Sequence, residues 1–237
     1  MALLGGHVGF VEYWEARPLN RIVRVPLDGG AAETVWEERA WIGHINTSPT
    51  QSHLLTFCHE GPWERVNNRI WTLDLASGQA RAICQRADPG QLFGHEYWLA
   101  DGLHVGYHGF EKSREADWSD PFLFGFARHD GEERRDYHSS SSTGHVHSLD
   151  GGLVVGDGEA RIDGATLRVW KLVDGRMEGP RVLARHDCTA RIQQLHVHPR
   201  FSPDGATVVF TSDRTTYGQV YEVAVGDWES LPLLEKP

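Results

Sequence analysis

The 237-residue sequence has only three cysteines, Cys58, Cys84 and Cys188, and they lie far apart. Three scattered cysteines are too few for a disulfide framework or a thiolate metal cage, and they suit a reducing compartment. We therefore expect buried free thiols rather than a disulfide-stabilised scaffold.

Long apolar runs are also missing, since no uncharged stretch reaches the roughly 18 residues that suggest a membrane helix. The first residues, MALLGGHVGFVEYW, reach Glu12 before a signal-peptide cleavage pattern develops. These features predict a soluble, cytoplasmic protein that neither crosses nor binds a membrane.

Basic side chains are in deficit, with 23 Lys and Arg against 33 Asp and Glu, for a formal charge of −10. Such a charge repels polyanions at long range and argues against nucleic acid as a partner. An acidic small molecule would need a local cationic site.

Amphipathic helical patterns with capping boxes are almost absent, whereas the sequence contains 26 Gly, 9 Trp and 14 His. Many aromatic residues between glycine-rich turns are typical of short strands. The sequence therefore predicts an all-β protein.

An internal repeat organises this β sequence. One phrase, a histidine followed by a turn and an apolar strand, occurs as GHINTSPTQSHLLTFCH from Gly43, GHEYWLADGLHVGYHG from Gly94, GHVHSLDGGLVVGDG from Gly144 and LHVHPRFSPDGATVVFTSD from Leu195. The leading histidines are spaced 51, 50 and 51 residues apart: His44, His95, His145 and His196. Strand–turn–strand segments alternate with these phrases and predict β-hairpins at residues 20–36, 68–84, 121–137 and 167–183.

A period near 50 residues with about four strands is typical of a β-propeller blade. We expect one propeller domain over residues 1–237, with four to five blades and an incomplete N-terminal part. Residues repeated once per blade occupy equivalent places around the axis, so the periodic histidines should converge at one mouth of the central channel.

The densest cluster of candidate ligands is the segment QQLHVHP, from Gln193 to Pro199. In an extended chain His196 and His198 point to the same side, and a bend could bring the Gln193 amide oxygen to the same point. A third imidazole would come from His145, with His147 as the competing choice. We prefer His145 because it shares the periodic place. This N/O donor set suits Mn²⁺, with Zn²⁺ or Fe²⁺ as competitors.

Two further candidates have structural alternatives. His95 could act as a general base, because the histidine pKa lies near neutrality, or it could be a core residue at a blade junction. Arg69 could bind a carboxylate. However, Asn20 and Arg21 occupy the same place in the previous hairpin, so the repeat favours a blade-edge role.

Other chemistry finds little support. The sequence contains no GxSxG, P-loop or strand-linked GxGxxG motif. Asp157 and Asp213 follow apolar strands, where a carboxylate commonly closes a turn, and we interpret both as structural.

Five ordered blocks between about residues 41 and 223 resemble the oligogalacturonate lyases of pectin degradation: FCHEGPWERVNNRIW, GHEYW, LVVGDG, ARHDCTARI and QLHVHPRFSPDGATVVFTSD. The resemblance implies a seven-bladed propeller with one Mn²⁺ held by three His and one Gln, whose N-terminal blades have no counterpart here. Its implied ligands are His145, Gln193, His196 and His198. It also implies His95 as the base and Arg69 as a catalytic and substrate-binding group. We further expect His59 to be a substrate contact.

The expected function is metal-dependent β-elimination of digalacturonate or short oligogalacturonides to 4-deoxy-5-keto uronate. One alternative is a non-catalytic TolB-like or WD-like propeller that binds protein partners. Another is a lyase for a different uronate oligosaccharide. The oligomeric state stays open.

Overall fold

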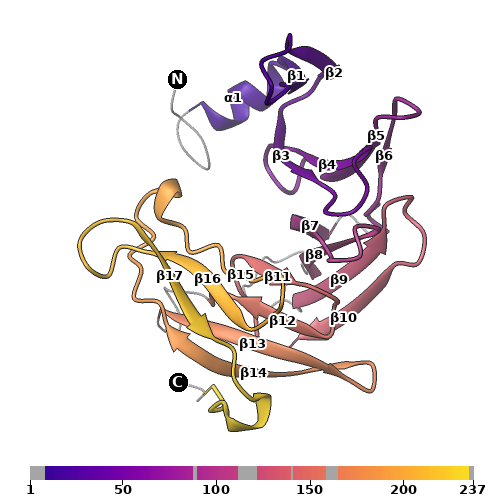
Figure 1. Cartoon of the computed structure of the whole chain (residues 1–237). Coiled ribbons are helices and arrows are strands. Elements are labelled where there is room, and N and C mark those ends of the chain that lie inside the picture. Colours follow the sequence, from indigo (N-terminus) through magenta and orange to yellow (C-terminus); the bar gives the residue numbers. More distant parts are fainter. Residues whose placement is uncertain (1–8, 88–89, 112–121, 140, 159–164, 235–237) are drawn as a thin grey trace.

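The computed structural model describes residues 9–87, 90–111, 122–139, 141–158 and 165–234. Four antiparallel sheets follow one another in chain order around an arc, in a four-blade β-propeller arrangement (Figure 1). The predicted all-β propeller fold is confirmed. Among the described residues, no helix is long and apolar enough to cross a membrane.

Each sheet is a meander whose strands pair in sequence order. The first sheet contains β3 (Ile42–Thr47), β4 (Leu54–His59), β5 (Ile70–Asp74) and β6 (Gln79–Ala82). The second contains β7 (Gln91–Trp98), β8 (His104–Glu111), β9 (Phe122–Arg128) and β10 (Arg135–Ser139). The third contains β11 (Val146–Ser148), β12 (Leu153–Gly156), β13 (Thr166–Val173) and β14 (Arg176–Arg185). The fourth contains β15 (Arg200–Phe201), β16 (Thr207–Ser212) and β17 (Gln219–Ala224).

The four hairpins expected from the sequence are confirmed as β1–β2, β5–β6, β9–β10 and β13–β14. The first of these, β1 (Leu19–Arg24) with β2 (Glu33–Arg39), forms a separate two-stranded sheet. Sequence patterns did not predict the helical segments α1 (Phe10–Glu15), η1 (Gln193–Leu195) and η2 (Trp228–Ser230). Each spans six residues or fewer, which is too short for a periodic pattern to develop.

Apolar side chains fill the spaces between successive sheets. Leu54 and Ile70 of the first sheet pack with Phe93 and Tyr107 of the second in one buried cluster. Burial of such side chains contributes roughly 1.5–3 kcal/mol each, which holds neighbouring blades together. The arc is therefore a continuous series of interlocked blades, and the first strands β3, β7, β11 and β15 line its inner side (Figure 1).

The ladder register identifies the residue that is equivalent in each blade. The inner strands pair with their neighbours through Asn46–Thr56, Tyr97–Gly106, His147–Val155 and Arg200–Val209. Two residues before each pair stands a histidine: His44, His95, His145 and His198. The periodic place in the fourth blade is therefore held by His198, and its prediction as His196 was wrong. The HxH sequence offered two candidates, and the structure has the strand begin two residues later than the spacing suggested.

Candidate functional site

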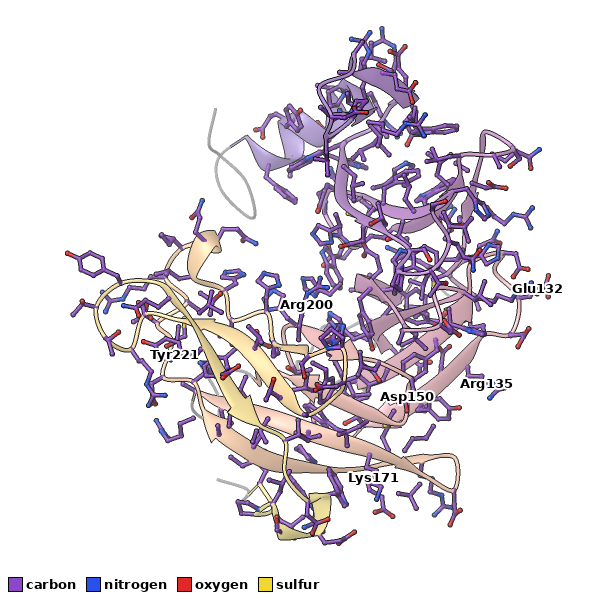
Figure 2. All side chains as sticks on the ribbon, viewed as in Figure 1. Glu132, Arg135, Asp150, Lys171, Arg200 and Tyr221 are labelled. Carbon is purple, nitrogen blue, oxygen red and sulfur yellow. The ribbon has the colours of Figure 1, made fainter. Side chains whose placement is uncertain are left out.

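A pocket of about 220 Å³ opens on the inner side of the arc. All four equivalent histidines line it, and Arg200 stands at its wall. Figure 2 shows Arg200 on this inner side, whereas Glu132 and Lys171 project from the outer side of the arc. The expected convergence of the periodic histidines is thus present in the structure.

Three imidazoles, from His145, His196 and His198, form a compact cluster at this pocket, which His145 and His198 line. Each offers a nitrogen within 4.8 Å of the others, and the ring centroids of His145 and His198 are 3.8 Å apart. His196 and His198 follow η1, His196 with an extended backbone and His198 with a left-handed one, φ 44°, and His145 lies directly before β11. The cluster therefore joins two neighbouring blades.

The donor set of this imidazole cluster fits a divalent metal. His145 Nδ1 lies 2.6 Å from Asp157 Oδ2, so its N–H donates to the carboxylate and Nε2 keeps a lone pair for an ion. Among the described residues, the buried His196 Nδ1 has no hydrogen-bond partner. A buried nitrogen without a partner is costly, and a bound ion would satisfy it.

Metal ligation requires neutral imidazoles, and lowered pKa values favour this form for His196 and His198. Desolvation and the neighbouring His145 lower the pKa of His196, and they lower the pKa of His198 to about 4. The Asp157 carboxyl behaves in the opposite way. Burial would raise its pKa, but hydrogen bonding to His145 and Thr143 keeps it below the usual value. A carboxylate therefore backs the cluster.

The structure separates the two candidate third histidines. His147 turns away from the cluster into the core, where its Nδ1 accepts a hydrogen bond from Phe201 N at 3.1 Å. His145 belongs to the cluster, and its role as a metal ligand stays a prediction. Gln193 is exposed at the start of η1, and its carbonyl accepts from His196 N at 3.2 Å. Its amide stays a predicted ligand.

His95 stands beside the imidazole cluster, with its ring centroid 4.6 Å from that of His145. A bulge in β7 gives it a left-handed backbone, φ 51°, and turns its ring into the pocket. Its Nδ1 lies 2.6 Å from Nε2 of the buried His108, on which it stacks. Desolvation, then the charges of His108 and His145, hold the pKa of His95 well below 6.5, so this imidazole is neutral near pH 7.

Arg69 is buried directly before β5, 7% exposed. Its Nη1 donates to Glu60 Oε2 at 3.0 Å, and its guanidinium lies 5.1 Å from the Trp63 ring centroid. Arg21, its counterpart in the first hairpin, is an exposed residue paired with Glu37. The blade-edge interpretation of Arg69 was therefore wrong, because the two positions differ in burial and partner.

His59 lies outside this constellation. It lines a different pocket of about 200 Å³, together with Trp14, Trp41 and Trp71, and its Nε2 is 2.8 Å from Glu38 Oε1. The structure thus places His95, His145 and His198 in one pocket, with His196 clustered beside the last two, and leaves His59 in another pocket.

Sequence reasoning missed the polar partners of the site. Asp157 was interpreted as a turn residue, whereas it hydrogen-bonds both the backbone and the ring of His145. His108 and Glu60 attracted no prediction. Their one sequence signal is position, since each lies on or directly after the second strand of its blade, across from the periodic histidine.

A sequence model of the family described as oligogalacturonate lyase matches residues 3–228. The chain belongs to the oligogalacturonate lyase family. It is 30% identical over 239 aligned positions to the oligogalacturonide lyase of Pectobacterium atrosepticum, covering 92% of this chain and 58% of that protein. The chain therefore spans under two thirds of the length of this curated family member.

Solved structures agree with this membership. An oligogalacturonate lyase in complex with manganese superposes with a TM-score of 0.77 at 28% identity, covering 92% of this chain and 57% of the other. A putative TolB from Agrobacterium tumefaciens superposes with a TM-score of 0.55 at 17% identity, covering 87% of this chain and 66% of the other. This second likeness shows the propeller fold alone.

Proposed function

We propose that the chain carries the active centre of a metal-dependent lyase that cleaves digalacturonate or short oligogalacturonides by β-elimination. The observation that carries the proposal is the cluster of His145, His196 and His198 directly beside the neutral, half-buried His95. Family membership supports the same chemistry. The cytoplasmic location remains a prediction.

The imidazole cluster would hold Mn²⁺, with the Gln193 amide as a fourth ligand. Imidazole and amide donors without a thiolate suit this ion, and the solved relative that binds manganese supports the choice. A bound divalent ion would supply Lewis-acid neutralisation of the uronate carboxylate, which makes the adjacent C5 proton easier to remove. Asp157 fixes the orientation of His145 from behind.

His95 is the proposed general base. When its Nδ1 carries the hydrogen and donates to His108 Nε2, its Nε2 keeps the lone pair that accepts the C5 proton. The electrons of the C5–H bond form the C4=C5 double bond, the bond between C4 and the glycosidic oxygen breaks, and the leaving oxygen takes up a proton. The unsaturated sugar then rearranges to the 4-deoxy-5-keto uronate.

Arg69 is the proposed cation for the acidic substrate. Glu60 pairs with Nη1, and Nε is buried without a hydrogen-bond partner among the described residues. A guanidinium held on one side in this way keeps donors for a second carboxylate. Arg69 would supply the local positive charge that an acidic substrate requires in a chain with a net charge of −10.

The test is turnover of digalacturonate by the purified chain with Mn²⁺, followed by mass spectrometry of the products. We expect 4-deoxy-5-keto uronate, lost with EDTA and in His196→Ala. The matched control is His53→Ala, because His53 is an exposed histidine in the turn before β4. Absence of product from a folded, Mn²⁺-loaded chain would reject the lyase proposal for this chain and favour a non-catalytic propeller. Turnover restricted to other uronate oligosaccharides would favour a different lyase specificity.

A further inference from the structure

A second group of ligating side chains lies in the first sheet, away from the imidazole cluster. His44 of β3, Cys58 of β4 and Glu60 directly after β4 place one ligand atom each within 4.8 Å of the others. His44 Nε2 and Cys58 Sγ both lie 3.3 Å from Glu60 Oε1. The role proposed above for the chain leaves His44 and Cys58 unused.

We propose that His44 Nε2, Cys58 Sγ and Glu60 Oε1 form a second divalent-cation site that prefers Zn²⁺. At zinc bond lengths of about 2.0–2.3 Å, the ligand atoms of a tetrahedral ion lie about 3.3–3.5 Å apart. The two 3.3 Å separations at Glu60 Oε1 come close to this spacing. One thiolate, one imidazole and one carboxylate form a mixed donor set typical of zinc, and an open position would remain.

The buried Glu96 carboxylate independently points to a cation here. Its side chain is 0% exposed, and neither oxygen has a hydrogen-bond partner among the described residues. Its Oε1 lies 3.3 Å from Nδ1 of His44, on the opposite edge of the ring from Glu60. A carboxylate behind a histidine fixes the ring so that the other nitrogen faces the metal.

The absence of a side chain at Gly43 leaves space for the second cluster, formed by His44, Cys58 and Glu60. A Cβ at this position would lie 2.9 Å from Glu60 Oε1 and 3.4 Å from Cys58 Sγ. Any side chain at residue 43 would therefore push Glu60 out of place. An ion could enter from the central pocket, which His44 lines with 35% of its side chain exposed.

The local charges also admit a divalent ion. Glu60, Glu96 and the Arg69 guanidinium leave one net negative charge around His44 and Cys58. With Nδ1–H of a neutral His44 facing Glu96, Zn²⁺ would bind the Nε2 lone pair and displace only the thiol proton of Cys58. The exchange adds one positive charge and offsets the net negative charge, so Arg69 and Glu60 could remain paired.

Cobalt spectroscopy tests this second site on the full chain, whatever its catalytic activity. Co²⁺ substitutes for Zn²⁺, and a coordinated thiolate produces a near-ultraviolet charge-transfer band that His and Gln ligands cannot produce. We expect this band in the wild-type chain and in His196→Ala, and its loss in Cys58→Ser. Cys188→Ser is the matched control, because Cys188 is likewise buried but lies outside the cluster.

Glu60→Gln and Gly43→Ala keep the test decisive should Cys58→Ser fail to fold. We expect each to weaken Co²⁺ binding at the second site at least tenfold while the thiol remains. Equilibrium dialysis with Zn²⁺ should give one ion fewer per chain in these variants than in wild type. Absence of the band in the wild type, or a band that survives Cys58→Ser, would overturn the proposal. Unchanged zinc stoichiometry in folded Glu60→Gln would overturn it too.

Discussion

Two polar clusters face the same pocket from different blades, and they are built from the same place in the repeat. His44 and His145 are equivalent by register, yet His44 lies among Cys58, Glu60 and Glu96, whereas His145 meets two imidazoles and Asp157. The difference arises from the second strand of each blade. The residues there that face the periodic histidines are Cys58, His108 and Asp157. The repeat thus places a histidine at the same position in each blade. The residue that faces it from the second strand determines which ligand group forms around it.

Removal of His95, the proposed base beside the two clusters, should cause the largest loss of activity. We expect His95→Ala to lower kcat for digalacturonate about 10²–10⁴-fold, because general-base catalysis contributes that much. Steady-state kinetics at saturating Mn²⁺ would measure it, with His53→Ala as the control. A His95→Ala variant within threefold of wild type would assign proton removal to another group.

Arg69→Ala should cause the next largest loss of activity. Loss of a charge-assisted hydrogen bond costs about 1.5–3 kcal/mol, or roughly 10–150-fold in kcat/KM. Arg69→Lys should recover only part of this loss, since an ammonium cannot reproduce the guanidinium geometry. Full recovery by lysine in the same kinetic assay would show that charge alone matters.

Asp157→Asn tests whether the imidazole cluster and the second cluster bind metal independently. Loss of the carboxylate behind His145 should weaken Mn²⁺ binding about 10–100-fold, the usual effect of a lost orienting partner. Isothermal titration calorimetry would measure this change. The thiolate–cobalt band of the second cluster should stay unchanged, and a parallel loss of both signals would mean that the clusters are not independent.

Protonation of His147 should lower the stability of the fold, whereas protonation of His44 should raise it. Burial, then Arg200, lowers the pKa of His147 to about 4, so the folded state resists its protonation and stability falls as pH drops from about 6.5 toward 4. Burial opposes protonation of His44 as well, but Glu96 and Glu60 outweigh it and raise the pKa of His44. Protonated His44 therefore stabilises the fold in acid. This contribution is lost as the pH rises through the pKa of His44 in the folded state.

Urea unfolding at several pH values would measure this contrast as the difference between each variant and wild type. We expect His147→Gln to lose less stability in acid than wild type does, by roughly 1–3 kcal/mol near pH 4. His44→Gln should be most destabilised in acid. If the stability difference from wild type changed with pH in the same direction for both variants, the opposite pKa shifts of His147 and His44 would be contradicted.

The sequence could predict the propeller and the converging histidines because both follow from periodicity. Regular spacing identified all four hairpins and placed His95 and His145 correctly. Within the HxH pair, spacing could not distinguish His196 from His198, because only the ladder register shows where β15 begins.

Partners across strands could not be predicted in the same way. Asp157 lies 12 residues after His145, and the same sequence position could equally close a turn. Arg21 and Arg69 share a local sequence, NRI, and differ only in what packs over them. Burial and pairing of polar side chains depend on the neighbouring blade, which local patterns do not encode.

The most direct test of the central claim, that the three imidazoles form the manganese site of this chain, is anomalous diffraction from crystals grown with Mn²⁺. We predict one strong manganese peak between His145, His196 and His198, within ligand distance of each. A map with no peak there, or with its main peak at His44, Cys58 and Glu60, would contradict the account.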